Sequence, residues 1–113
     1  MCGIIAYINS NIDCYNIIYN GLKQLQNRGY DSAGITTIDP SGNFFTTKYA
    51  SCENNDSLKL LGENSNVHIN KKIGIGHTRW STHGAKTDEN SHPHSCMKNI
   101  FTIVHNGIIE NYQ

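Results

Sequence analysis

The sequence has no excess of charge of either sign, since nine lysines and arginines balance nine aspartates and glutamates. A chain without a strong field of one sign does not favour nucleic acid or an anionic membrane as a partner. Long hydrophobic runs are absent too, and the apolar stretches fall far short of the roughly 20 residues of a transmembrane helix. We therefore expect neither a nucleic-acid partner nor a membrane span.

The beginning of the chain lacks the features of a secretory signal, because no basic flank or small-residue cleavage site accompanies the apolar run at 4–8. A strand that starts so early leaves no room for a leader. No Cys-x-x-Cys pair occurs among the four cysteines, Cys2, Cys14, Cys52 and Cys96. This spacing is typical of free thiols in a reducing compartment rather than of a disulfide framework. We expect a cytoplasmic location.

At 113 residues the chain is long enough for one small domain with one core. Apolar residues at three- and four-residue spacing from Ile12 to Leu25 predict an amphipathic helix, with Asn11 or Asp13 as its cap and Gly29 as its stop. A second, short helix is expected at 56–61. Five segments are typical of strands: 3–8, 33–38, 44–49, 73–78 and 100–105.

The connections between these elements differ in character. The first strand is expected to be buried, since its apolar residues are nearly continuous. A hairpin turn is predicted at 39–43, and a loop at 62–72 is expected to be the most expendable part of the chain. The segment 79–99 is rich in His, Thr, Ser and Asn, and loops of that length are usually functional or disordered.

The resulting order is β-α-β-β, a short helix, then β-loop-β, an α+β arrangement with many strands and few helices. A sheet must bury a face against another layer, and this chain supplies little material for the second face. We expect either the front part of a larger domain or a subunit that is completed by a partner.

Cys2 has an unusual position for a nucleophile. Met1 precedes a small side chain, the setting in which initiator methionine is usually removed, and removal would place a thiol and a free α-amine on one residue. The reference pKa values are about 8.5 for a thiol and about 7.7–8.0 for an α-amine, so the amine is available as a base near neutral pH. The alternative is a small hydrophobe entering a strand.

Two further groups have the chemistry of a binding site. Arg79 at a strand end suits a two-pronged grip on a carboxylate, although a solvated surface arginine is the common alternative. Asn106 and Gly107 suit an oxyanion hole, because a side-chain amide and a backbone N–H then point at one developing charge. As a dipeptide, Asn-Gly is also a common turn.

A metal site is a third possibility. His92, His94 and Cys96 alternate in the sequence and would face one side of an extended segment, where His77 or His83 would complete a zinc site. Proline at position 93 fits a loop better than a strand, and metal ligands are commonly paired at helical or turn spacing. The pattern therefore favours a metal module less than an enzyme site.

Taken together, the motifs resemble the N-terminal glutaminase domain of the glutamine–fructose-6-phosphate aminotransferases, which are class II glutamine amidotransferases within the N-terminal nucleophile hydrolases. Order and spacing fit from one end of the chain to the other. The matching segments are CGI at 2–4, RGYDSAG at 28–34, HTRW at 77–80, THG at 82–84, HPH at 92–94 and HNGIIEN at 105–111.

The resemblance implies a fold and a domain assignment. The family fold is an αββα sandwich of antiparallel sheets, of which residues 1–113 would hold only the first part, with no isomerase domain. Ser81 and Ser91 stand where the family often has alanine, which we judge harmless. The sequence stops at Gln113, partway through the family's glutaminase domain, and we expect it not to make glucosamine 6-phosphate alone.

The resemblance also implies a reaction, the hydrolysis of glutamine to glutamate and ammonia through a cysteine thioester, with no metal or organic cofactor. Cys2 would attack the side-chain amide with its own α-amine as base, and Asn106 and Gly107 would hold the oxyanion. By the same resemblance, Arg79 would bind the α-carboxylate of glutamine, and Trp80 would close over the substrate. Thr82 and His83 would line the pocket, and Arg28 would support the nucleophile from behind.

Three hypotheses follow for what this chain does. The first is a glutaminase half reaction as in glucosamine-6-phosphate synthesis. The second is a catalytically incomplete remnant or interaction subunit, completed by another chain or by a copy of itself. The third is the His/Cys metal-binding module.

Overall fold

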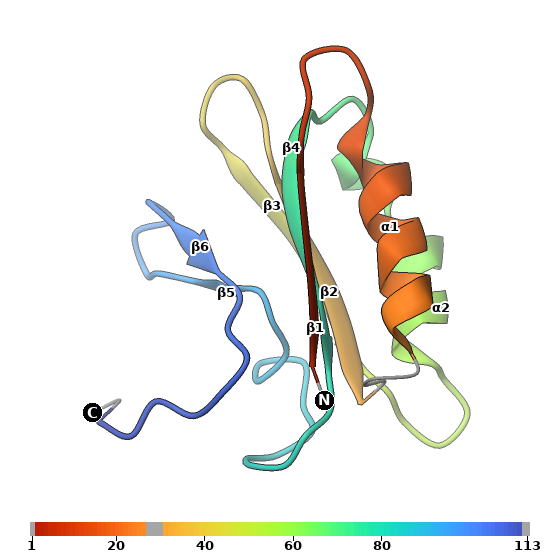
Figure 1. Ribbon diagram of the computed structural model, residues 1–113, viewed down its shortest axis with the longest axis vertical. Helices are drawn as coiled ribbons and strands as arrows, with labels where there is room; N and C mark the ends of the chain where they lie inside the picture. The colour runs from red at the N-terminus through yellow and green to blue at the C-terminus, as the bar shows by residue number, and fades with distance from the viewer. Residues whose placement is uncertain (1, 27–30, 112–113) are drawn as a thin grey trace.

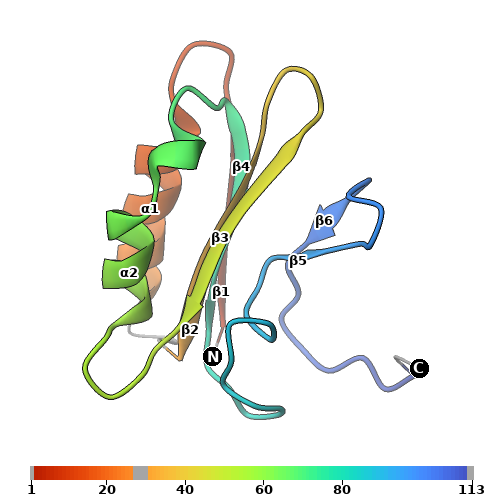
Figure 2. The same ribbon diagram turned by 180° about the vertical axis from the view of Figure 1, so that it is seen from behind.

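Two helices cover one face of an antiparallel sheet, and a small two-stranded sheet lies beyond the opposite face (Figures 1 and 2). The structure is a computed structural model, and it describes residues 2–26 and 31–111. In chain order the elements are β1 (Gly3–Ile8), α1 (Cys14–Leu25), β2 (Ser32–Ile38), β3 (Phe44–Ala50), α2 (Ser57–Glu63), the 3₁₀ helix η2 (Asn66–His68), β4 (Ile73–Arg79), β5 (His94–Ser95) and β6 (Thr102–Ile103).

The larger sheet has the strand order β1-β4-β2-β3, with every neighbouring pair antiparallel. β4 is therefore central although it comes late in the sequence. It pairs with β1 so that Gly3 lies opposite Thr78, and with β2 so that Ser32 lies opposite Arg79. The chain is an α+β fold with antiparallel sheets, as predicted.

Both predicted helices form, and an aspartate caps each of them. The side chain of Asp13, one of the two predicted caps, accepts the Tyr15 N–H at 3.1 Å, and Asp56 accepts the Leu58 N–H at 3.2 Å. A side-chain oxygen there satisfies a backbone donor that the first helical turn leaves free. The predicted stop at Gly29 lies outside the described residues.

The core lies between α1 and the helix-facing side of the sheet. Ile18 is fully buried, and its side chain passes close to Gly74 and Gly76, where an added Cβ would come within 2.7 and 2.6 Å of it. Glycine in β4 therefore lets the helix approach the sheet closely. The other members of this buried core among the described residues are Cys14, Leu22, Ala33, Ile35, Leu58 and Leu61.

The prediction for β1 is wrong in one respect. The strand lies at the sheet edge and its burial alternates, so that Ile4 is 43% and Ile8 74% exposed. These side chains, with Ile73 of β4, belong to the face opposite the helices. A continuous apolar run resembles a strand buried on both faces, but here one of those faces is left open.

The expectation that 62–72 is an expendable loop is also wrong. Part of it forms η2, and the His68 ring there is fully buried between Thr37 and Thr47, with hydrogen bonds of 2.7 Å and 2.9 Å to their hydroxyls. Because both ring nitrogens of His68 are hydrogen-bonded to residues of β2 and β3, this side chain fixes the segment to the sheet.

The last strand is shorter than predicted. Only Thr102 and Ile103 of the predicted strand at 100–105 form β6, and they pair with β5 inside the segment predicted to be a loop. Among the described residues no helix is long and apolar enough to cross a membrane.

Candidate active site

The antiparallel register of β1 and β4 brings the two ends of the site together. Because Gly3 lies opposite Thr78, the residue before β1 comes beside the last residue of β4. Cys2 and Arg79 are thus neighbours in space although 77 positions separate them. Gly3 is needed for this approach, since an added Cβ would come within 2.9 Å of both Leu25 and Thr78 side-chain atoms.

A pocket of about 370 Å³ opens at this point and collects most of the predicted site residues. Arg28 lies outside the described residues, and Asn106 adjoins the pocket through Cys2. The lining residues are Cys2, Arg79, Trp80, Thr82, His83, His92, His105, Gly107 and Ile108. Side chains from the start, middle and end of the described chain therefore share one cavity.

Cys2 is half buried at the pocket wall. Its Sγ lies 3.7 Å from the Trp80 carbonyl oxygen, and its own carbonyl accepts the Asn106 side-chain N–H at 3.0 Å. Gly107 follows with φ +143°, a conformation that favours glycine. The thiol, the amide and the glycine N–H thus belong to one small region.

The Arg79 guanidinium holds the loop that follows β4. It donates to the carbonyls of Ala85 at 3.1 Å and His83 at 2.5 Å. Gly84 lies between them with φ +82°, and its carbonyl accepts the Ser81 hydroxyl at 3.1 Å. A guanidinium has more N–H donors than these two bonds use, so the side chain shapes the loop and keeps donors for a ligand.

Asp31 anchors the same loop from the other side, a role that the sequence did not assign to it. Its carboxylate accepts the Ser81 N–H at 2.6 Å and pairs with Lys86 at 2.9 Å. Partial burial raises the pKa of Asp31, but the hydrogen bonds from Lys86 and Ser81 and the Lys86 and Arg79 charges outweigh that effect and lower it. The carboxylate is therefore ionised wherever the protein is folded at moderate pH.

Three histidine rings lie next to one another at the pocket, whose wall includes the middle ring, His92. His77 and His92 stack with centroids 4.3 Å apart, and His92 lies 4.4 Å from His94. Burial and the neighbouring positive groups lower the pKa of His92 to about 3, and burial also lowers those of His77 and His94. The rings are therefore neutral near pH 7.

The metal hypothesis gains no support from this cluster. In the described ranges no group of three or more His, Cys, Asp or Glu side chains is arranged to hold a metal ion. His92 Nδ1 instead accepts the His105 backbone N–H at 3.3 Å. The lone pair of this nitrogen is therefore already engaged in a hydrogen bond.

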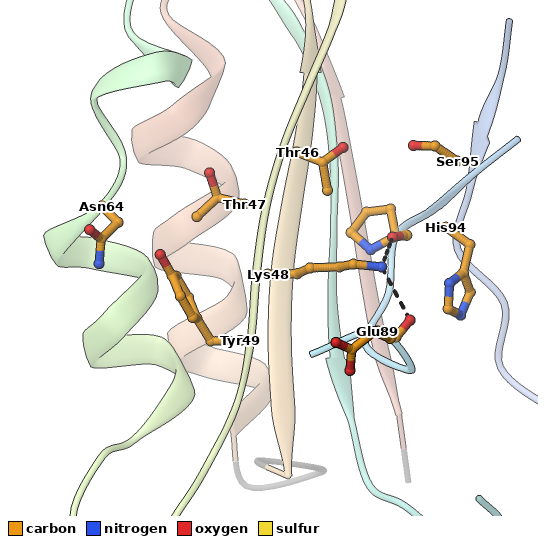
Figure 3. Close-up of a pocket in the computed structure, with 9 residues that line it drawn as sticks. Thr46, Thr47, Lys48, Tyr49, Asn64, Glu89, His94 and Ser95 are labelled. Atoms are coloured by element: carbon orange, nitrogen blue, oxygen red, sulfur yellow. Dashed lines mark hydrogen bonds between the residues drawn. The ribbon is translucent and has the colours of Figure 1, made fainter. Parts of the chain in front are cut away.

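A larger cavity, of about 680 Å³, lies between β3 and the β5 segment and holds none of the predicted catalytic residues. Lys48 of β3 reaches across it and donates to the carbonyls of Glu89 and Pro93 at 3.4 and 3.2 Å (Figure 3). It also donates to the carbonyl of Ser91 at 2.9 Å. Burial lowers the pKa of Lys48. The lysine ties the segment 89–93 to the sheet, and no sequence motif pointed to it.

Comparison with known proteins supports the relationship that the motifs indicated. No family model matches the chain. A probable glutamine–fructose-6-phosphate aminotransferase [isomerizing] of Acanthamoeba polyphaga mimivirus is 47% identical over 113 residues, 99% of this chain. Enzymes of the same name from Oceanobacillus iheyensis and Geobacillus kaustophilus are 46% and 45% identical over 99% and 100% of it.

The chain spans only 18% of the length of these relatives. The match covers nearly all of the sequence, so the segments around Cys2, Arg79 and Asn106 all fall within it. The chain is therefore a relative of the N-terminal part of the glutamine–fructose-6-phosphate aminotransferases.

Proposed function

We propose that residues 1–113 form part of a class II glutaminase domain, which hydrolyses glutamine to glutamate and ammonia through a thioester on Cys2. The observation that carries this proposal is that one pocket brings together six of the predicted site residues. They are Cys2, Arg79, Trp80, Thr82, His83 and Gly107. These groups lie far apart in the sequence, and the sequence motifs around them all point to one reaction.

In the proposed first step the Cys2 thiolate attacks the side-chain amide carbon of glutamine, and a C–S bond forms. The carbonyl oxygen takes up the electron pair, and the Asn106 amide and Gly107 N–H are its proposed donors. The α-amine of Cys2, exposed once Met1 is removed, takes the thiol proton and passes it to the departing nitrogen. The C–N bond then breaks and ammonia leaves.

In the second step water attacks the thioester, glutamate leaves and the thiol is restored. Arg79 would bind the α-carboxylate of glutamine with guanidinium donors beyond the two that hold its loop. Trp80 is 43% exposed beside the thiol and would close over the ligand. Arg28 remains the proposed support behind the nucleophile. No metal or organic cofactor takes part.

We also place the fold among the N-terminal nucleophile hydrolases, whose αββα sandwich has two antiparallel sheets between helical layers. Helices on one face of the β1-β4-β2-β3 sheet, and the antiparallel β5-β6 pair beyond the other face, support this assignment (Figure 2). The aminotransfer step in the relatives' names would need chain segments beyond this sequence.

The test is glutamate release from glutamine by the purified chain, together with its intact mass. We expect a mass without Met1, measurable glutamate, and complete loss of release in Cys2→Ala. The matched control is Cys52→Ala, which removes an exposed thiol outside the pocket and should leave the rate unchanged. Release that persists in Cys2→Ala would contradict the proposal.

The second candidate function is an incomplete subunit that needs another chain. The apolar side chains Ile4, Ile8 and Ile73, exposed on the sheet face opposite the helices, favour it. It predicts a self-associating chain that does not hydrolyse glutamine. Since the open sheet face favours association under either function, the glutamate assay, run on a preparation whose association is measured by sedimentation velocity, distinguishes the two.

A further inference from the structure

Asn106 is held between two groups of opposite hydrogen-bonding character. Its Nδ2 lies 3.0 Å from the Cys2 carbonyl oxygen, and its Oδ1 lies 2.9 Å from Nε2 of His77. A backbone carbonyl only accepts hydrogen bonds, so the amide nitrogen must face Cys2. The amide oxygen then faces His77, and the imidazole must donate through Nε2.

The two partners of this contact differ greatly in how firmly they are held. His77 is 1% exposed in the central strand β4, between Ile4 of β1 and Gly34 of β2. Asn106 is exposed, on a segment that forms neither helix nor strand after β6. The sheet therefore supplies a buried partner for the amide through His77, whereas Asn106 itself lies outside any helix or strand.

The surroundings also fix the tautomer of His77. Burial lowers its pKa, as do the nearby Arg79 and His94, against the opposing effect of the Asn106 and His105 hydrogen bonds. A neutral imidazole carries one N–H, and the contact with Asn106 places it on Nε2. The ring is packed against His92, which accepts the backbone N–H of the residue before Asn106.

We propose that His77 is a positioning residue for the glutaminase reaction, which donates from Nε2 to the Asn106 amide oxygen and so turns the amide nitrogen toward Cys2. One amide N–H binds the Cys2 carbonyl, and the second is left for the developing oxyanion. This inference rests on the proposed function of Cys2 and Asn106. His77 touches neither the thiol nor the substrate and acts only through Asn106.

The first test needs no activity. Long-range proton–nitrogen correlations of the ¹⁵N-labelled chain should show His77 protonated on Nε2 and bare on Nδ1. The Asn106 side-chain amide protons should exchange slowly with solvent. Their chemical shift should change in His77→Leu but not in His77→Gln, because the glutamine amide can still donate to Asn106. His68→Leu, at the second fully buried histidine, is the control and should leave that shift in place. A proton on Nδ1 alone would overturn the inference.

The second test is kinetic. His77→Leu should lower kcat for glutamate release by about 100-fold with little change in KM, since misplacing one oxyanion donor costs that much, and His77→Gln should restore most of the rate. Equal losses in both variants, or no loss in either, would contradict a positioning role. A wild-type chain that releases no glutamate would count against the proposed function instead, and the tautomer would still decide the role of His77.

Discussion

Among single residues, His68 shows most directly how this small fold holds a polar group in its core. Both ring nitrogens are bonded to threonine hydroxyls, and the ring stacks on Tyr15 with centroids 6.1 Å apart. Burial lowers the pKa of His68 to about 4. The folded state therefore favours the neutral ring, whereas His68 in the unfolded chain can take up a proton near its ordinary pKa.

This burial predicts a specific loss of stability in acid. The folded pKa of His68 lies below the ordinary value of about 6.5, so its contribution is complete above pH 6.5 and is lost as the pH falls toward 4. We expect the free energy of unfolding to drop by about 3 kcal/mol over this range from His68 alone. Urea denaturation at pH 7, 6, 5 and 4 measures the drop.

The matched variant is His68→Leu, which we expect to be less stable at pH 7 but to depend less on pH between 7 and 4. An identical pH profile in the variant and the wild type would show that another group, such as His92, carries the acid sensitivity.

Residue by residue, the sequence predicted the members of the pocket better than their contacts. Cys2, Arg79 and Gly107 each have a common structural alternative when taken alone, and it is the resemblance of the motifs around them to one family that predicts a shared pocket. The hydrogen-bond partners were not predictable, since the bonds of Asp31 to Ser81 and of Asn106 to His77 span 50 and 29 positions. Such pairs depend on strand order, which local patterns do not specify.

At the scale of elements, a close contact with β2 holds the segment 89–93, which we call the His92 segment and which places His92 in the pocket wall. Gly34 faces this segment, and an added Cβ would lie 2.1 Å from the His92 carbonyl oxygen and 2.8 Å from the Lys48 Cβ. Lys48 binds three carbonyls of the same segment. Glycine in β2 and lysine in β3 therefore act together on it.

We predict that Gly34→Ala displaces the His92 segment and lowers the free energy of unfolding by about 1–3 kcal/mol, the usual range for overpacking. The backbone atoms that the methyl group meets have little freedom to move aside. Thermal or urea unfolding measures the loss, and the His92 ring shifts in an NMR spectrum report the displacement.

Gly42→Ala is the control, because an added Cβ there meets nothing within 4 Å and only the positive φ of 87° opposes it. If the control disturbs His92 as much as Gly34→Ala does, the effect comes from general destabilisation rather than from the contact.

The sequence predicted elements well where a single periodic pattern extends over many residues. Each of the longer elements has its apolar spacing within its own segment, and each helix has an aspartate cap directly before it. These elements are β1, α1, β2, β3, α2 and β4. By contrast β5 and β6 have two residues each, and they form only because the chain folds back between His94 and Ile103. A pairing that short has too few residues to produce a pattern.

The whole molecule has one face of its main sheet covered by helices and the other only partly covered (Figure 1). On that second face β1 is an edge strand whose Ile8 is 74% exposed. An apolar edge strand is a common place for two chains to pair, and exposed apolar patches mark interaction surfaces. We therefore expect concentration-dependent association of the isolated chain.

We predict that Ile8→Lys reduces this association and changes the free energy of unfolding by no more than about 0.5 kcal/mol, as is usual for surface positions. Sedimentation velocity at rising concentration measures the first effect and urea unfolding the second. The control is Val67→Lys, an exposed apolar position in η2 rather than on the open face. Association that is unchanged in Ile8→Lys would locate the contact elsewhere.

The pairing of Gly3 with Thr78 has a practical consequence for anyone handling this protein. It fixes Cys2, the first described residue, in the wall of the cavity, so any amino acids fused ahead of it would start at the cavity and acylate its nitrogen. An affinity tag on that side would therefore block the proposed chemistry, which needs a free nitrogen on Cys2.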